Sequence, residues 1–153
     1  MARAVRYLRR VFLCLFLLFA AAQLIRPARS NPPSNPSATL MKHATPQVAA
    51  IFDRACRDCH SHDTRWPWYA NIAPASWLLA YDVAKGREHF NYSEWTSYDE
   101  DDQDKLLGGV CSLSKRGRMP VPAYLVMHAD ARLTPADIVT LCDWSERMRD
   151  ALQ

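Results

Sequence analysis

The sequence Cys56-Arg57-Asp58-Cys59-His60 constrains the fold of this chain more than any other feature. Two cysteines separated by two residues and followed at once by a histidine occur in three kinds of site: a redox dithiol, a zinc clip and the attachment site of a c-type haem. Each kind of site needs a different surrounding fold. The rest of the sequence therefore decides among them.

The hydrophobic pattern around this motif is helical. Thr45-Pro46 combines a capping residue with proline at the first helical position, and apolar residues then recur at helical spacing up to Cys56. Three further helices are predicted to begin at Pro74, at the capping box Ser97-x-x-Glu100 and at Thr134-Pro135. No stretch alternates with period two for long enough to predict a strand. We therefore predict an all-α domain at residues 45–153.

The predicted domain combines regular helices with long irregular segments. The helix from Pro74 carries Trp77, Leu78 and Tyr81 on one side. The segments 61–73 and 116–123 are long and irregular for a domain of this size. A bound haem would supply the missing core, as in a small cytochrome c-like helical domain wrapped around its haem.

Residues 1–26 form a basic and then apolar leader. Six arginines and no acid lie in residues 1–30, and Val11–Ile25 has no charge. We favour a retained transmembrane anchor over a signal peptide cleaved at the small residues Ala20-Ala21-Ala22. Either interpretation predicts export of residues 31–153 to the periplasmic side of the inner membrane in a bacterial cell envelope. The membrane is then a partner through the N-terminal segment.

The remaining composition describes a linker and excludes one class of partner. Residues 27–44 are rich in Pro, Ser and Asn, which is typical of an extended linker. Residues 31–153 carry 13 basic and 16 acidic side chains and no basic stripe, although the whole chain has a formal charge of +3. We therefore expect no nucleic-acid partner.

The helical context favours haem among the three kinds of site. A thioredoxin-type Cys-x-x-Cys opens a helix after a strand, whereas this motif ends a helix. A structural zinc site needs four ligands, and Cys111 and Cys142 are single cysteines 31 residues apart. In c-type attachment Cys56 and Cys59 add to the vinyl groups and His60 ligates the iron. We predict one covalent haem c and its iron as the cofactor.

The second axial ligand is predicted to be Met119. It is followed by proline in the late irregular segment Lys115–Tyr124, and proline favours an extended conformation that presents the thioether. His128 or His89 are alternatives, as is an open sixth position. Methionine and histidine ligation together would suit electron transfer.

Arg65 and the aromatic residues after the motif are further candidates for contact with the haem. Trp66, Trp68 and Tyr69 are predicted to wall the haem, and an indole N–H, a phenol or Arg65 to bind a propionate. The alternative is that these are ordinary core aromatics. Cys111 and Cys142 either form a disulfide or remain buried thiols.

A series of longer motifs gives these residues a family resemblance. Trp-Pro-Trp-Tyr, Pro-x-Ser-Trp and Asn-x-Ser-Glu-Trp follow the Cys-x-x-Cys-His motif in that order, and Met119-Pro120 comes later. Together with the membrane-proximal segment 23–35, this order resembles the small haem-binding domain family of bacterial envelope proteins. The resemblance implies a single c-type haem held by Cys56, Cys59 and His60. It implies no particular reaction, because family members are characterised by haem binding.

The function that we predict is a membrane-tethered periplasmic monohaem c-type cytochrome. It would transfer single electrons to or from a redox protein that the sequence does not identify, and we expect an electron carrier rather than an enzyme. The alternative is a haem enzyme or ligand sensor, peroxidase-like or gas-binding, with an open or displaceable sixth iron position. A haem-bearing module of a larger respiratory complex is a third hypothesis.

Overall fold

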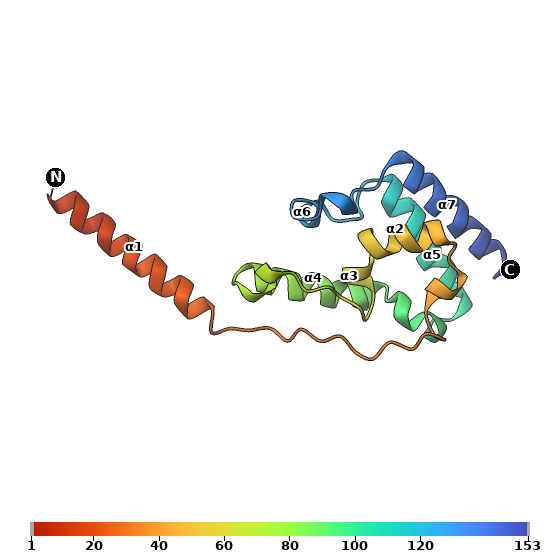
Figure 1. Ribbon diagram of the computed structural model, residues 1–153, viewed down its shortest axis with the longest axis horizontal. Coiled ribbons are helices and arrows are strands. Elements are labelled where there is room, and N and C mark those ends of the chain that lie inside the picture. The colour runs from red at the N-terminus through yellow and green to blue at the C-terminus, as the bar shows by residue number, and fades with distance from the viewer. Residues whose placement is uncertain (1, 153) are drawn as a thin grey trace. The chain divides into compact units, whose positions relative to one another are not determined.

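The computed structural model describes residues 2–152, and within that range the chain is helical with no strand, as predicted (Figure 1). The longer helices are α1 (Ala2–Ala22), α2 (Pro46–Ala55), α4 (Ala75–His89), α5 (Glu100–Lys115) and α7 (Pro135–Asp150). The shorter ones are η1 (Leu40–His43), α3 (Arg57–His60), η2 (Trp68–Asn71), η3 (Tyr92–Ser97), α6 (Pro122–Leu125) and η4 (Ala129–Ala131).

The described chain divides into two compact units. Residues 2–30 and 66–82 form one of them, which we call the N-terminal unit, and residues 31–65 and 83–152 form the other, which we call the motif unit. Helix α4 contributes its first half to the N-terminal unit and its second half to the motif unit.

The core of the motif unit is built around α2, α5 and α7. Helix α5 packs along α7, and α2 packs against α7 (Figure 1). Phe52 of α2 is buried, and its ring lies edge-to-face 5.5 Å from the ring centroid of Tyr92 and 5.6 Å from that of Trp144. The indole N–H of Trp144 donates to the carbonyl of His43 at 3.0 Å. These contacts fix α2, at whose end the Cys-x-x-Cys-His motif begins.

Local capping chemistry sets the start of two helices where the sequence predicted it. Thr45 accepts the backbone N–H of Val48 at 3.3 Å, with Pro46 at the first position of α2. Thr134 and Asp137 form a reciprocal capping box at the start of α7. Both starts are therefore determined by residues within one helical turn.

Helix α5 begins with a different cap from the one predicted. Asp99 accepts the backbone N–H of Asp102 at 2.8 Å, whereas the hydroxyl of Ser97 donates to the carbonyl of Glu94 at 2.7 Å. The predicted capping box at Ser97 was therefore wrong. Aspartate caps a helix as well as serine does, and Asp99 lies two residues further along the chain.

A disulfide joins α5 to α7 in the motif unit. Cys111 and Cys142 are bonded, with their Cα atoms 4.6 Å apart and a sequence separation of 31. This settles the alternative of buried thiols in favour of a bridge. A loop of that length corresponds to about 3–4 kcal/mol of stabilisation in the chain-entropy treatment.

The segment from Asn31 onward is extended, and hydrogen bonds hold it to the chain that follows the motif. The side-chain amide Nδ2–H of Asn31 donates to the carbonyl of Thr64 at 2.9 Å, and the hydroxyl of Ser34 donates to Asp63 Oδ1 at 2.9 Å. His62 Nδ1 lies 3.3 Å from the carbonyl of Pro33. This part of the predicted linker is thus fastened within the motif unit.

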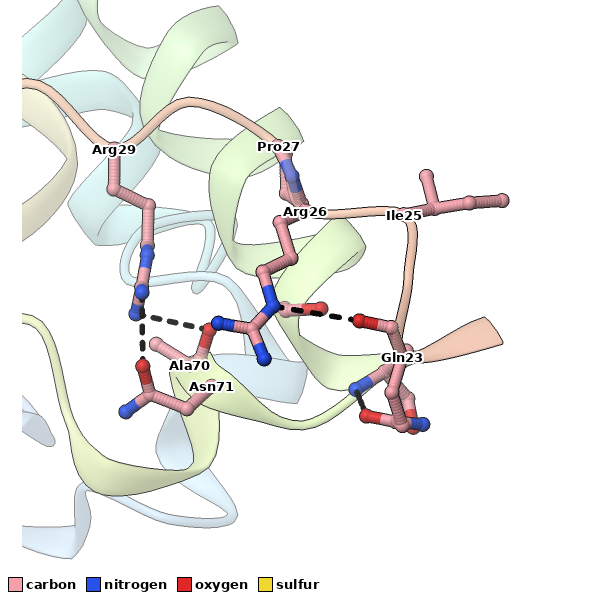
Figure 2. A pocket seen from close by; sticks show the side chains of 9 residues that line it. Gln23, Ile25, Arg26, Pro27, Arg29, Ala70 and Asn71 are labelled. Atoms are coloured by element: carbon pink, nitrogen blue, oxygen red, sulfur yellow. Dashed lines mark hydrogen bonds between the residues drawn. The ribbon is translucent and has the colours of Figure 1, made fainter. Parts of the chain in front are cut away.

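In the N-terminal unit, the chain after α1 is bonded to residues 70–77. The side-chain amide of Gln23 accepts the backbone N–H of Ala73 at 2.9 Å and donates to its carbonyl at 3.3 Å. Arg29 donates to the carbonyl of Ala70 at 3.0 Å and to Asn71 Oδ1 at 2.8 Å, beside a small pocket that these residues line (Figure 2). Residues 23–29 are therefore an integral part of this unit.

Helix α1 forms as the apolar leader predicts, but it does not support a membrane-spanning anchor. No helix within residues 2–152 is both long and apolar enough to cross a bilayer. Four arginines occupy the first half of α1, and the uncharged stretch that follows is shorter than the ~20 residues that a crossing needs. The signal-peptide interpretation stays a prediction.

The predicted apolar face of α4 is exposed. Trp77, Leu78 and Tyr81 face solvent in the first half of the helix, whereas Val83 begins the second half as a buried residue. The sequence pattern placed these three side chains on one side of the helix, and the structure leaves all three exposed. Helical spacing shows which residues share a side, but it does not show whether another element covers that side.

Candidate functional site

The Cys-x-x-Cys-His motif lies at a break between two helices. Cys56 ends α2, with its backbone N–H bonded to the carbonyl of Phe52, and it also caps the single turn of α3 that runs to His60. Cys56 and Cys59 are both thiols rather than disulfide partners. Burial, with the neighbouring Cys59, raises the pKa of the Cys56 thiol to about 12. A reactive redox dithiol has a lowered pKa instead, so this environment disfavours that alternative.

His60 is held in one tautomer by two backbone carbonyls of α4 and its C-terminal end. Its Nδ1 atom lies 3.1 Å from the carbonyl oxygen of Gly86 and 2.9 Å from that of Phe90. Since carbonyls only accept hydrogen bonds, Nδ1 carries the proton and Nε2 keeps its lone pair. Burial lowers the pKa of His60, which favours the neutral ring. A neutral, oriented imidazole with an available nitrogen is the form that ligates a metal.

Gly86 lets α4 approach the motif closely. A Cβ atom at this position would lie only 2.3 Å from the carbonyl oxygen of Cys59 and 2.9 Å from its Cβ atom. No side chain fits there, so glycine is needed for the backbone carbonyl of residue 86 to reach His60. The sequence reasoning missed this residue, although glycine inside a helix is a signal of close packing.

Arg87, the next residue of α4, holds the chain that leaves the motif. Its guanidinium donates to the carbonyl of Ser61 at 2.7 Å, to the hydroxyl of Thr64 at 2.9 Å and to Asn31 Oδ1 at 3.1 Å. Ser61 directly follows His60 and is fully buried. Arg87 thus fixes the exit of the motif, and nothing in the local sequence pattern had indicated it.

A hydrogen bond joins helix α6 to the Cys-x-x-Cys-His motif. The hydroxyl of Tyr124 donates to Asp58 Oδ2 at 2.8 Å, and the ring of His128 stacks on that of Tyr124 with centroids 3.9 Å apart. Burial raises the pKa of Asp58, although the bond from Tyr124 acts in the opposite direction. A carboxyl, a phenol and an imidazole are therefore gathered beside α3.

Met119 lies in the irregular segment between α5 and α6. Its backbone N–H donates to the carbonyl of Leu113 at 3.4 Å. Tyr124, which contacts Asp58 of the motif, follows five residues later. Because five residues of extended chain span about 17 Å, Met119 lies within that distance of Tyr124, whose side chain contacts α3. Met119 remains a predicted ligand.

Arg65 is engaged by acids of the motif unit. Its guanidinium lies 3.4 Å from Asp53 and 3.5 Å from Asp58, and its backbone N–H donates to Asp58 Oδ1 at 3.0 Å. About half of the Arg65 side chain is exposed. Its predicted role toward a propionate would therefore compete with these two ion pairs, and it stays a prediction.

The aromatic candidates belong to the N-terminal unit. The guanidinium carbon of Arg29 lies over the ring of Trp66, 6.0 Å from the ring centroid. The rings of Trp68 and Tyr69 meet edge-to-face with centroids 5.7 Å apart. Trp68 is largely exposed. Their predicted contact with the haem remains a prediction.

Two buried N–H groups are free to donate a hydrogen bond to a bound group. Among the residues that the structure describes, Trp66 Nε1 and Arg57 Nε are buried without a hydrogen-bond partner from the chain. Because buried polar groups are almost always hydrogen-bonded, these N–H groups suit the acidic edge of a bound group. Within the motif unit, the Nε–H of Arg57 joins the two thiols and the oriented His60, and this set of groups fits a haem. The zinc alternative lacks a ligand set, since residues 2–152 contain no group of three or more His, Cys, Asp or Glu arranged to hold a metal.

Comparison with known proteins identifies the family. A family model described as a haem-binding domain matches residues 17–147. No curated protein and no solved structure matches the chain. The match covers most of the sequence and both described units, so this chain belongs to the haem-binding domain family.

Proposed function

We propose that this haem-binding domain is a monohaem c-type cytochrome that transfers single electrons. The observation that carries the proposal is the arrangement of His60. Its Nδ1–H is bound by the carbonyls of Gly86 and Phe90, so Nε2 is available for iron beside two reduced thiols in Cys-x-x-Cys-His spacing. Haem, when bound there, supplies an iron that gains and loses one electron.

The chain's own groups then attach and tune that iron. Cys56 and Cys59 would add their thiols across the two vinyl groups, each forming one carbon–sulfur bond while the thiol proton passes to carbon. His60 would ligate through Nε2. The two carbonyls that accept its Nδ1–H make the imidazole a stronger donor and fix its plane.

Met119 is the sixth ligand that we propose. The bond between Tyr124 and Asp58 supports this because it brings the segment that follows Met119 to the motif. A thioether opposite an imidazole raises the reduction potential and leaves no position open for a substrate. Both properties suit an electron carrier.

Arg65, Trp66, Trp68 and Tyr69 are proposed to contact the porphyrin or its propionates. The buried and unpartnered Nε1–H of Trp66 supports this best, since a propionate would satisfy it. Arg65 is a weaker candidate because Asp53 and Asp58 already engage it.

We also propose that the domain is exported to the periplasmic side of a bacterial inner membrane and exchanges electrons there with a redox protein. A basic and then apolar leader precedes it. The disulfide between Cys111 and Cys142 supports an oxidising compartment.

A second function is favoured by the cluster at α6. Asp58, Tyr124 and His128 offer acid and base groups beside the motif, as a peroxidase-like haem enzyme would need. This function requires an open or displaceable sixth iron position, so it is incompatible with firm ligation by Met119.

Expression of the full chain in a bacterium that attaches haem c to exported proteins tests the proposal. We expect haem that stays with the polypeptide under denaturing conditions and shows the pyridine haemochrome spectrum of two thioether bonds. Cys56→Ala and Cys59→Ala should each abolish two-bond attachment, while Cys14→Ala in α1 should not. Haem that dissociates on denaturation from the unchanged chain would overturn the covalent, c-type part of the proposal.

A further inference from the structure

The N-terminal unit carries large apolar side chains that its own fold leaves exposed. Leu24 is 84% exposed, Ile25 64%, Tyr81 62%, Leu78 51% and Trp77 36%. We call these five residues the aromatic face. Burying apolar side chains of this size is normally favourable, and a large exposed patch marks a surface that binds something.

Hydrogen bonds make the aromatic face one surface within the N-terminal unit. The indole N–H of Trp77 donates to the carbonyl of Ile25 at 2.8 Å, which joins α4 to the chain after α1. The pairing of Gln23 with Ala73 fixes the same two segments one turn away. Trp77, Leu78 and Tyr81 are neighbours on one side of α4, at spacings of three and four residues. Ile25 is also one of the residues that line the small pocket of this unit (Figure 2).

The N-terminal unit that carries this face has a positive formal charge. Residues 1–30 and 66–82 contain six arginines and a single acid, Asp82, for a formal charge of +5, whereas the rest of the chain has 13 basic and 15 acidic side chains. Arg26 and Arg29 lie in the segment that carries Leu24 and Ile25, and both are exposed. The positive charge of the protein is thus concentrated in the unit that exposes aromatic residues.

We propose that the aromatic face docks the protein on a bilayer surface that contains anionic lipid. Trp and Tyr prefer the headgroup level of a membrane, where a ring sits in an apolar layer and its polar atom meets water. Leu24, Ile25 and Leu78 would enter the outer acyl region, and Arg26 would lie among the phosphates. This attachment does not need α1 to cross the membrane, and it does not depend on the proposed electron transfer.

Lipid fits this surface better than a protein partner for a reason of composition. The face combines aliphatic and aromatic side chains with arginines but has only one acidic residue in its unit. A protein partner would be expected to use acids and hydrogen-bonding groups of both signs at the rim. Headgroup phosphates need only positive charge.

Co-sedimentation of the haem-loaded full chain with vesicles tests the proposal. We expect binding to vesicles of phosphatidylcholine with phosphatidylglycerol, and weaker binding to phosphatidylcholine alone or at high salt. Leu78→Gln with Tyr81→Gln should weaken binding by about tenfold or more, because two apolar anchors are lost while α1 is unchanged. The matched control is Val126→Gln with Val139→Gln, which removes two exposed apolar residues from the motif unit and should leave binding unchanged.

Arg26→Gln gives an independent test that leaves the helices intact. The only described bond of its side chain is from Nε to the carbonyl of Gln23, at 3.4 Å. We expect a reduction of severalfold in binding to anionic vesicles and a shallower dependence on salt. Equal binding by all these variants would overturn the proposal and leave α1 as the sole attachment. Lost haem with unchanged vesicle binding in the α4 variant would also overturn it, since the face would then serve the cofactor.

Discussion

The two halves of α4 are equally helical but have opposite roles. The first half exposes Trp77, Leu78 and Tyr81, which are large apolar side chains of the kind that usually pack in a core. The second half contains Gly86 and Arg87, and these two residues position the motif by close backbone approach and by hydrogen bonds to Ser61, Thr64 and Asn31. In this helix the functional contacts are made by the smallest and the most polar side chains, and the large apolar ones face outward.

The largest effect is expected at Gly86. Gly86→Ala places a methyl group 2.3 Å from the carbonyl oxygen of Cys59, so α4 must move away from the motif. We expect a loss of about 3 kcal/mol in the free energy of unfolding, measured in urea, and a sharp fall in haem attached per chain.

Gly109→Ala is the matched control for that prediction. Gly109 also lies inside a helix, and a Cβ atom there meets nothing within 4 Å. We expect it to be neutral or to stabilise the protein by up to about 1 kcal/mol. Similar behaviour of the two alanine variants would contradict the close approach of α4 to the motif.

Arg87→Gln should have an intermediate effect. It removes charged hydrogen bonds to Ser61 and Thr64, at a cost of about 2 kcal/mol in the free energy of unfolding. Because Ser61 follows His60, we also expect a shifted reduction potential of the bound haem, measured by potentiometric titration. Lys85→Gln, which removes an exposed ion pair with Glu88, should change neither quantity. An unchanged potential in Arg87→Gln would limit this residue to a structural role.

The smallest effect on stability is expected in the first half of α4. Leu78→Gln with Tyr81→Gln replaces exposed side chains by good helix formers, so the free energy of unfolding should change by less than about 0.5 kcal/mol. Thermal unfolding followed by circular dichroism measures this. A loss of several kcal/mol would mean that these residues are core after all and that the two halves of α4 do not differ.

Local chemistry made part of the fold predictable. The Thr-Pro starts of α2 and α7 depend on atoms within one turn, and the sequence contains all of them. The prediction of the α5 cap failed because Ser97 and Asp99 are both good capping residues and lie two positions apart. The exposure of Trp77 and Tyr81 could not be read from periodicity, because it depends on which distant segment covers the helix.

The candidate site was predictable to a similar extent. Spacing identified Cys56, Cys59 and His60, since the chemistry of attachment lies within five consecutive residues. Gly86 and Phe90, which orient His60, lie 26 and 30 residues away, and only the folded chain brings their carbonyls to its ring. The pairing of Cys111 with Cys142 was one of two open alternatives for the same reason.

The optical spectrum of the purified haem-loaded protein, oxidised and reduced, with and without carbon monoxide, tests most directly whether Met119 ligates the iron of an electron carrier. We expect a low-spin haem with the weak red absorption band of methionine bound to iron(III), no response to carbon monoxide, and loss of that band in Met119→Ala. Met127→Ala, which removes an exposed methionine beyond α6, is the control and should leave the spectrum unchanged. A high-spin spectrum that shifts with carbon monoxide in the unchanged protein would contradict the electron carrier and favour the enzyme or sensor.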